Sequence, residues 1–282
     1  MNKFLPKIIS FTQAPLTASE ADSLNGMCLY DRHYDTANVI RGTSGNGTLV
    51  CKENGELLLA YLPGAVRDLL TGDLINALRR AATETHNRGS AADGRVFSGI
   101  IGYYDRYTRW PYCRITRFTR DDRTGWSTIL PLIGRMGEAY RDAVPDRYRA
   151  QHAFVEVTSP DFRIEGTPFT TATVNRNLQF NAHRDKGNLK LGTVVMCVPK
   201  ASGYTGGLLV FPKYRLGVDA RAGDVVLFDG DEYHGNTALV PTASTFERIS
   251  VVCYYRSAMI HCGTAEEEHE RAKRRKPGDP LH

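Results

Sequence analysis

Two histidines and one aspartate have the residue types and the order of a transition-metal site. His183 and Asp185 form a His-x-Asp pair in "QFNAHRDKGN", and His234 follows later in "FDGDEYHGN". Two imidazoles and one carboxylate suit non-heme Fe(II), because three ligands on one face leave other coordination positions open. Each residue also has an ordinary explanation: His183 can end a strand, Asp185 can occupy a turn, and His234 can be a buried histidine with satisfied hydrogen bonds.

An arginine and a serine further along the chain extend the candidate site. Arg248 and Ser250 are two residues apart in "ERISVVCYYR", and alternate residues of a strand face the same side. A guanidinium binds a carboxylate through two parallel hydrogen bonds. The pair is therefore suited to hold the far carboxylate of 2-oxoglutarate, whose 2-oxo acid end and O2 fit the open positions on iron. Arg248 alone is as readily a surface ion-pair former, but the ordered set favours the iron site.

The second half of the chain predicts the scaffold that brings these residues together. Short runs rich in Val, Leu, Phe and Tyr are separated by Gly, Pro and Asn, which is typical of an antiparallel barrel or jelly roll. At one open end of such a barrel the candidate ligands can converge. The expected strands cover residues 178–183, 191–198, 207–211, 215–219, 224–229, 233–237 and 247–255.

The rest of the chain predicts one hairpin and three helices. Residues 47–65 read as a β-hairpin around Glu53-Asn54-Gly55. Apolar spacing predicts helices over 66–86 and 126–144, the second bent or started near Pro131. A last helix is expected over 264–276, where Thr264 and Glu267 form a capping box and basic residues follow acidic ones.

Composition limits the classes of protein. Among 282 residues, 41% are hydrophobic and 24% charged, so a sizeable core is expected and wholesale disorder is not. The apolar runs are shorter than the ~20 residues of a membrane span, and the polar, Pro-interrupted N-terminus is unlike a secretory signal. Six cysteines without a C-x-x-C pair indicate reduced thiols rather than a disulfide framework. We therefore expect an intracellular protein, cytoplasmic or nuclear, without a membrane partner.

One segment has the composition of a nucleic-acid contact. Residues 103–123 hold six Arg and six aromatics against three Asp, which suits phosphate contact combined with base stacking. An edge strand with a solvated charged face explains the segment equally well. The net charge of +5 permits a polyanionic partner without requiring one.

Three phrases resemble one family. "HRDKGN", "GYTGGLLVFPKYRLGVDARAGDVVLFDGDEYHGN" and "ERISVVCYYR" resemble the oxygenase core of the TET/JBP nucleobase dioxygenases, over roughly residues 95–262. The resemblance implies a double-stranded β-helix (jelly-roll, cupin-like) within an α+β, mainly β chain. It also implies oxidation of the 5-methyl group of a pyrimidine in nucleic acid, dependent on Fe(II), 2-oxoglutarate and O2. His183, Asp185 and His234 would then bind iron.

The same resemblance divides the chain and assigns further roles. Residues 1–94 would be a hairpin-and-helix extension packed on the core, and 95–262 the dioxygenase core. The iron-binding barrel would lie at about 175–257, with 263–282 as a charged helix and tail. Arg248 and Ser250 would hold 2-oxoglutarate.

The resemblance also gives four residues a place at the substrate base: Asn188 as a polar contact, Tyr254 as a stacking ring, and Arg117 and Arg256 nearby. A methyl C–H is not acidic, so a general base cannot activate it, whereas iron chemistry that removes a hydrogen atom can. The base must also leave the stack, and a flipped base is held by stacking and edge hydrogen bonds. Tyr254 is as readily an aromatic of the barrel core.

The identity of the base depends on position 256. The cytosine-oxidising animal members of the family carry histidine there, whereas the thymine-hydroxylating kinetoplastid members carry arginine, as this chain does. We predict 5-methylcytosine in DNA as the first substrate, with thymine accepted alongside it. Single-stranded DNA and RNA remain alternatives to duplex DNA.

Three other hypotheses stay open at the level of sequence. The first is a thymine-specific hydroxylase. The second is a hydroxylase of proteins or small molecules on the same barrel, which retains the iron and Arg248 without base contacts. The third is a non-catalytic nucleic-acid reader that uses residues 103–123 alone, although a reader has no need of three metal ligands.

Overall fold

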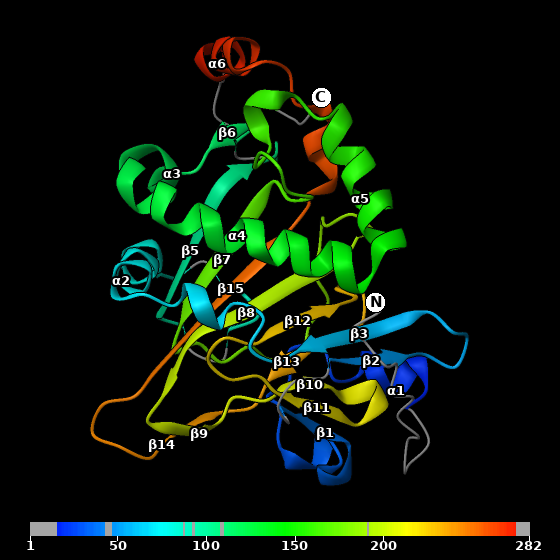
Figure 1. Ribbon diagram of the computed structural model, residues 1–282. Coiled ribbons are helices and arrows are strands. Elements are labelled where there is room, and N and C mark those ends of the chain that lie inside the picture. The colour runs from blue at the N-terminus through cyan, green and yellow to red at the C-terminus, as the bar shows by residue number, and fades with distance from the viewer. Residues whose placement is uncertain are drawn as a thin grey trace.

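Two β-sheets face each other, and helices cover the outer face of the larger one (Figure 1). This is a computed structural model, and it describes residues 16–42, 47–86, 88–91, 94–107, 110–190 and 192–274.

The large sheet has the order β2 (Thr48–Cys51), β3 (Leu57–Leu62), β12 (Val225–Phe228), β8 (Val194–Ser202), β15 (Glu247–Tyr254), β7 (Thr171–Arg176), β5 (Val96–Tyr104) and β4 (Glu84–Thr85), and β6 (Arg114–Ile115) pairs with β5. The small sheet has the order β1 (Val39–Arg41), β11 (Leu216–Asp219), β10 (Leu209–Phe211) and β13 (Gly235–Asn236). A separate ribbon pairs β9 (Tyr204–Gly206) with β14 (Leu239–Pro241).

The alternation of side chains along the strands divides the core into two layers. On β8, Val195 and Cys197 belong to the layer beneath the helices, whereas Val194, Met196 and Val198 face the small sheet. Successive residues of a strand point to opposite faces, so a strand buried on both sides must be apolar throughout. The result is the mainly β jelly roll with helices that the sequence predicts.

The helices back the large sheet rather than close the barrel. The long helix α4 (Arg123–Ala143) crosses β7, β15 and β8 in Figure 1, and it buries Ile129, Ile133 and Met136 against them. The other helices are α1 (Ala18–Asp22), α2 (Gly72–Ala81), α3 (Arg117–Asp121), α5 (Pro145–Val157) and α6 (Ala265–Arg274). Short 3-10 turns are η1 (Asp31–His33), η2 (Thr36–Asn38), η3 (Arg67–Leu69), η4 (Pro160–Phe162), η5 (Pro212–Tyr214) and η6 (Ser257–His261). None of the helices in the described ranges is long and apolar enough to cross a membrane.

The hairpin and the helices agree with the prediction in place but differ at their ends. β2 and β3 pair around the predicted turn. α2 begins only at Gly72, because the Thr71 side chain accepts a hydrogen bond from the Leu74 amide at 3.2 Å and caps the helix there. α4 begins before the predicted range, and Pro131 lies within it on the exposed side.

The strand predictions are confirmed from β8 onward, and three features differ. Residues 178–183 do not form a strand: they make only single bridges, Phe180 with Ala91 and His183 with His234. Strands β5 and β7, which the sequence did not indicate, are central in the large sheet. Within residues 1–94, β1 joins the small sheet and β2, β3 and β4 the large one, so this segment lies within the sheets rather than packed on them.

The prediction of reduced thiols is wrong for two of the six cysteines. Cys113 and Cys262 form a disulfide, with 5.7 Å between their Cα atoms. They are 149 residues apart, so only the fold brings them together and their spacing in the sequence carries no signal. Cys28, Cys51, Cys197 and Cys253 are free.

The C-terminal helix is capped as predicted. The Thr264 amide donates to Glu267 and the Glu267 amide donates to the Thr264 hydroxyl, which completes the capping box. Glu268 is buried on this helix and pairs with Arg106, which fixes α6 beside the disulfide. The end of the predicted tail, residues 275–282, lies outside the described residues.

Candidate metal and cosubstrate site

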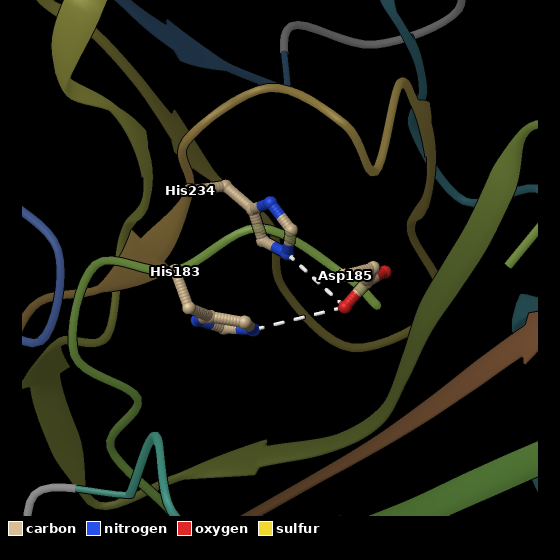
Figure 2. Close-up of side chains that lie close together, drawn as sticks. All are labelled: His183, Asp185 and His234. Carbon is tan, nitrogen blue, oxygen red and sulfur yellow. Dashed lines mark ion pairs between the residues drawn. The ribbon is translucent and has the colours of Figure 1, made fainter. Parts of the chain in front are cut away.

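The three predicted ligands meet at one point. Asp185 Oδ1 lies 3.8 Å from His183 Nε2 and 3.9 Å from His234 Nε2, and the ligand atoms all lie within 4.8 Å of one another. Figure 2 shows both rings directed at the carboxylate, with His183 and Asp185 on one loop and His234 on another. Two imidazoles and a carboxylate converging on one side match the facial triad of non-heme iron.

Hydrogen bonds at the back of each ring select the tautomer that a metal requires. His183 Nδ1 lies 2.8 Å from the Asn181 carbonyl, and His234 Nδ1 lies 2.8 Å from the Glu232 carbonyl. A carbonyl only accepts, so Nδ1 carries the proton and the Nε2 lone pair faces the site. Burial and then the neighbouring His234 lower the pKa of His183 to about 4, which leaves its ring neutral and able to bind a metal.

The backbone fixes the two loops against each other. The amides of His183 and His234 each donate to the other's carbonyl at 2.9 Å. The Asp185 amide donates to the Gly230 carbonyl at 2.9 Å. Gly230 must be glycine here, because a Cβ would lie 2.9 Å from Asp185 Oδ2 and 2.8 Å from a methyl of Val194.

The triad lies in the wall of a cavity of about 540 Å³. Arg248, Ser250 and Tyr254, from alternate positions of β15, also line this cavity, together with Asn188 and Arg256. The predicted residues therefore face one space, with the exception of Arg117. The volume is within the range of small-molecule sites, which are usually about 300–1,000 Å³.

Arg248 is buried, and one of its donors has no partner among the described residues. Its side chain is only 5% exposed, and its Nε has no hydrogen-bond partner among the described residues. Burial lowers the pKa of Arg248, against the effect of the neighbouring Tyr204, but a guanidinium stays protonated. A buried cation facing a cavity fits an anionic ligand, and a carboxylate satisfies both its charge and its donors.

A row of polar side chains that the sequence did not reveal lies beside Ser250. In the register of the sheet, Ser250 on β15 is opposite Asn175 on β7, which is opposite Ser98 on β5. Ser98 Oγ donates to Asn175 Oδ1 at 2.7 Å and accepts from Arg88 Nε at 2.8 Å. Arg88 and Asn175 both line the cavity. Arg88 follows the short strand β4, in a stretch without periodicity, so no pattern in the sequence marks it.

Asn188 and Tyr254 are tied to the site from opposite sides. Asn188 Nδ2 donates to Asp185 Oδ2 at 3.1 Å, so this residue also orients the carboxylate of the predicted metal ligand. The Tyr254 hydroxyl lies 2.9 Å from that of Thr173 on the adjacent strand, which holds its ring against the cavity wall.

The Arg256 guanidinium is held by contacts with neighbouring residues. Its Nε lies 3.2 Å from the buried carboxylate of Asp105, its Nη1 donates to the Lys186 carbonyl at 2.8 Å, and its guanidinium lies over the Tyr104 ring. Gly187 passes directly beneath it, since a Cβ there would lie 2.7 Å from Arg256 Nη2. Arg256 thus anchors the loop that carries Asp185.

Arg117 is not brought to the cavity. Its side chain is 92% exposed on α3 and lies 3.6 Å from Asp121. Within residues 103–123, two arginines are used internally: Arg106 pairs with Glu268, and Arg114 lies over the rings of Tyr104, Tyr107 and Trp110. Arg120 and Arg123 are exposed, and Arg109 lies outside the described residues.

A double-stranded β-helix that brings two histidines, one aspartate and a buried arginine to one cavity is typical of one class, the 2-oxoglutarate- and Fe(II)-dependent oxygenases. Residues 99–257 match the Tet_JBP family, described as the oxygenase domain of the 2OGFeDO superfamily. The match covers more than half of the chain, and the protein belongs to this family.

Relatives with curated functions and solved structures agree with this membership. The chain is 35% identical over 240 residues to thymine dioxygenase JBP1 of Trypanosoma brucei brucei, covering 82% of this chain and 28% of that protein. It is 32% identical over 189 residues to the bifunctional helicase and thymine dioxygenase JBP2 of Trypanosoma brucei brucei (strain 927/4 GUTat10.1), covering 66% of this chain and 17% of that protein. The structure of NgTET1 in complex with 5mC DNA has the same fold, with a TM-score of 0.56 and 16% identity over 94% of this chain and 92% of that one. The chain thus spans less than a third of the length of these two curated relatives.

Fe(II), 2-oxoglutarate and O2 are the cofactor and cosubstrates of the superfamily, and the residues present fit them. The triad offers two neutral nitrogens and one oxygen, and Arg248 offers a buried cation in the same cavity. When bound, iron with these cosubstrates supplies oxidation of C–H bonds that no acid or base can activate. The residues that would hold these groups are His183, Asp185 and His234 for iron, and Arg248 with Ser250 for the 2-oxoglutarate carboxylate.

Proposed function

We propose that this protein is a dioxygenase that oxidises the 5-methyl group of a pyrimidine in DNA. The reaction converts the methyl group, O2 and 2-oxoglutarate into the hydroxymethyl base, succinate and CO2. The observation that carries the proposal is the single cavity that holds the triad, the ring of Tyr254 and the buried Arg248, whose Nε has no partner among the described residues. His183, Asp185 and His234 bind the metal in this account, and Arg248 with Ser250 binds 2-oxoglutarate.

A base enters such a cavity only after it leaves the duplex. Flipped bases are held by stacking on one face and hydrogen bonds at the edge. Tyr254 supplies an aromatic ring, and Asn188 supplies an amide at the edge of the same space. Because Asn188 Nδ2 donates to Asp185, its Oδ1 is directed away from that carboxylate and is available to accept a hydrogen bond. An acceptor there suits the amino group of cytosine and the N3–H of thymine alike.

We keep 5-methylcytosine as the first substrate and place thymine beside it as the second candidate. The specific observation in favour of thymine is that the curated relatives at 32–35% identity are named thymine dioxygenases. Arg256, the residue that separates the two groups of the family, is held by Asp105 and Lys186 rather than free in the cavity. We therefore expect it to act on base choice through the loop at 185–188 and not by direct contact alone. We also place the protein inside the cell, with its DNA.

The test is an assay on isolated substrates. Purified protein with Fe(II) and 2-oxoglutarate is incubated with methylated duplex DNA, unmethylated duplex DNA, single-stranded DNA and RNA, and nucleosides are measured by mass spectrometry. We expect 5-hydroxymethylcytosine or 5-hydroxymethyluracil from DNA, and neither with His183→Ala or Asp185→Ala. Absence of both products would overturn the proposal. Succinate release that does not respond to nucleic acid would instead favour a hydroxylase of proteins or small molecules. Salt-dependent DNA binding without turnover would favour a reader.

A further inference from the structure

The turn at residues 229–232 holds the metal site from behind. Its Gly230 carbonyl accepts the Asp185 amide at 2.9 Å, and its Glu232 carbonyl lies 2.8 Å from His234 Nδ1. A shift of this turn therefore moves one ligand by its backbone and rotates the ring of another. Loss of such supporting contacts around metal ligands typically lowers metal affinity by about 10- to 100-fold.

The side chains of the same turn are bound by one lysine from the N-terminal hairpin. Lys52 Nζ lies 2.9 Å from Asp229 Oδ2 and 2.7 Å from Glu232 Oε1, and all three side chains are 13% exposed. Lys52 sits at the hairpin turn between β2 and β3, where its amide donates to the Glu56 carbonyl at 2.7 Å. The hairpin is outside the family-matched residues 99–257.

Further contacts keep the cluster ordered. The Tyr214 hydroxyl donates to Glu232 Oε1 at 3.0 Å, Lys213 Nζ lies 3.8 Å from Glu232 Oε2, and Glu56 lies 3.9 Å from Lys52 Nζ. Burial would lower the pKa of Lys52, but hydrogen bonds with Glu232 and Asp229 raise it overall, so the lysine is charged. Lys52 is thus the one cation among the described residues that contacts both largely buried carboxylates, Asp229 and Glu232, at less than 3 Å.

We propose that Lys52 is a positioning residue for the metal site: it fixes the 229–232 turn so that Asp185 and His234 converge. The inference rests on the iron site described above and not on the identity of the substrate. Without Lys52, the two carboxylates repel each other across a turn that carries both supporting carbonyls. We expect the turn to open and the ligands to separate.

The test measures binding of Mn(II), a redox-inert probe for Fe(II), to the full chain by electron paramagnetic resonance. For Lys52→Met we expect metal affinity to fall about 10-fold, the lower end of the 10- to 100-fold cost of losing a direct contact to a metal ligand, because Lys52 acts through the turn. Lys52→Arg, which keeps the charge, should recover most of the affinity. Glu232→Gln removes one carboxylate and keeps the pair with Asp229, so it should fold normally and lose affinity only several-fold.

A matched control separates positioning from general stability. Arg106→Met also breaks a buried ion pair, with Glu268, but contacts neither the turn nor a ligand. It should lower the melting temperature while leaving Mn(II) affinity within about twofold of wild type, since distant sites act independently. Equal losses of affinity in the Arg106 and Lys52 variants, or unchanged affinity in Lys52→Met and Glu232→Gln, would overturn the proposal. Wild-type protein that binds Mn(II) but oxidises no DNA would overturn the proposed substrate alone.

Discussion

Replacement of Arg248 by methionine should raise the stability of the protein without 2-oxoglutarate and weaken the binding of 2-oxoglutarate. In the empty protein the guanidinium is buried and its Nε has no partner among the described residues. Methionine has a similar length and no charge, so it fills the same space without the cost of an unpaired donor. Arg248→Met should therefore stabilise the protein when 2-oxoglutarate is absent.

The magnitudes follow from the same contact. An unsatisfied buried donor lowers the free energy of unfolding by about 1–3 kcal/mol, and Arg248→Met removes this cost. For a domain of this size, each kcal/mol of added stability raises the melting temperature by ~2–4 °C. Loss of one partner of a buried charge pair costs about 2–5 kcal/mol, so the variant should bind 2-oxoglutarate roughly 30- to several-thousand-fold more weakly.

The assay is thermal unfolding in the presence of Mn(II), with and without 2-oxoglutarate. Wild type should melt higher when 2-oxoglutarate is added, whereas Arg248→Met should start higher and not respond. DNA affinity, measured by fluorescence anisotropy, should stay within about twofold, because Arg248 lies at the cosubstrate end of the site. Arg80→Met, which removes an exposed arginine of α2 paired with Asp122, is the control and should retain the response to 2-oxoglutarate.

Two results would contradict the assignment of Arg248 to 2-oxoglutarate binding. If Arg248→Met melts lower than wild type and still responds to 2-oxoglutarate, Arg248 is a structural residue. If the variant loses affinity for 2-oxoglutarate and DNA to the same degree, Arg248 has been misassigned.

Three further predictions concern single residues. Gly230→Ala places a methyl group 2.9 Å from Asp185 Oδ2 and should weaken Mn(II) binding with little change in DNA affinity; unchanged metal binding would contradict the close approach. Tyr254→Phe keeps the aromatic ring, so the DNA concentration that gives half-maximal activity should stay within a few-fold of the wild-type value. Tyr254→Ala should raise this concentration about 10- to 100-fold, which corresponds to the loss of one stacked base. Hydrogen bonding to Arg79 lowers the pKa of Glu247 below its ordinary value of 4.5. The stability that this carboxylate adds is therefore present above pH 4.5 and lost as the pH falls through its folded pKa, and Glu247→Gln should flatten that loss in acid unfolding curves.

The meeting of His183, Asp185, His234, Arg248 and Ser250 at one cavity was predictable because these residues are close in sequence or follow strand periodicity. His183 and Asp185 share a loop, and Arg248 and Ser250 alternate on one strand, so the spacing of each pair predicts that its two side chains lie close together. His234 follows a strand and a turn on the same barrel. The strands from β8 onward were predicted for the same reason.

What the sequence did not reveal depends on contacts between distant segments. Arg88 reaches the cavity through Ser98 on β5, and Lys52 reaches the 229–232 turn from a hairpin far earlier in the chain. The Cys113–Cys262 pair likewise forms only in the folded protein. Arg117 was placed near the base across a long variable stretch, whereas the fold leaves it on an exposed helix. Local pattern carries no information on such pairings.

The most direct test of the proposed DNA oxidation compares the amounts of two products of one reaction. Wild-type protein with Fe(II) and 2-oxoglutarate is given DNA that carries 5-methylcytosine, and hydroxymethyl nucleosides and succinate are counted at early times. We expect equal amounts of the two products, with both abolished by Asp185→Ala. Succinate formed without any hydroxymethyl nucleoside, from 5-methylcytosine or from thymine, would contradict it.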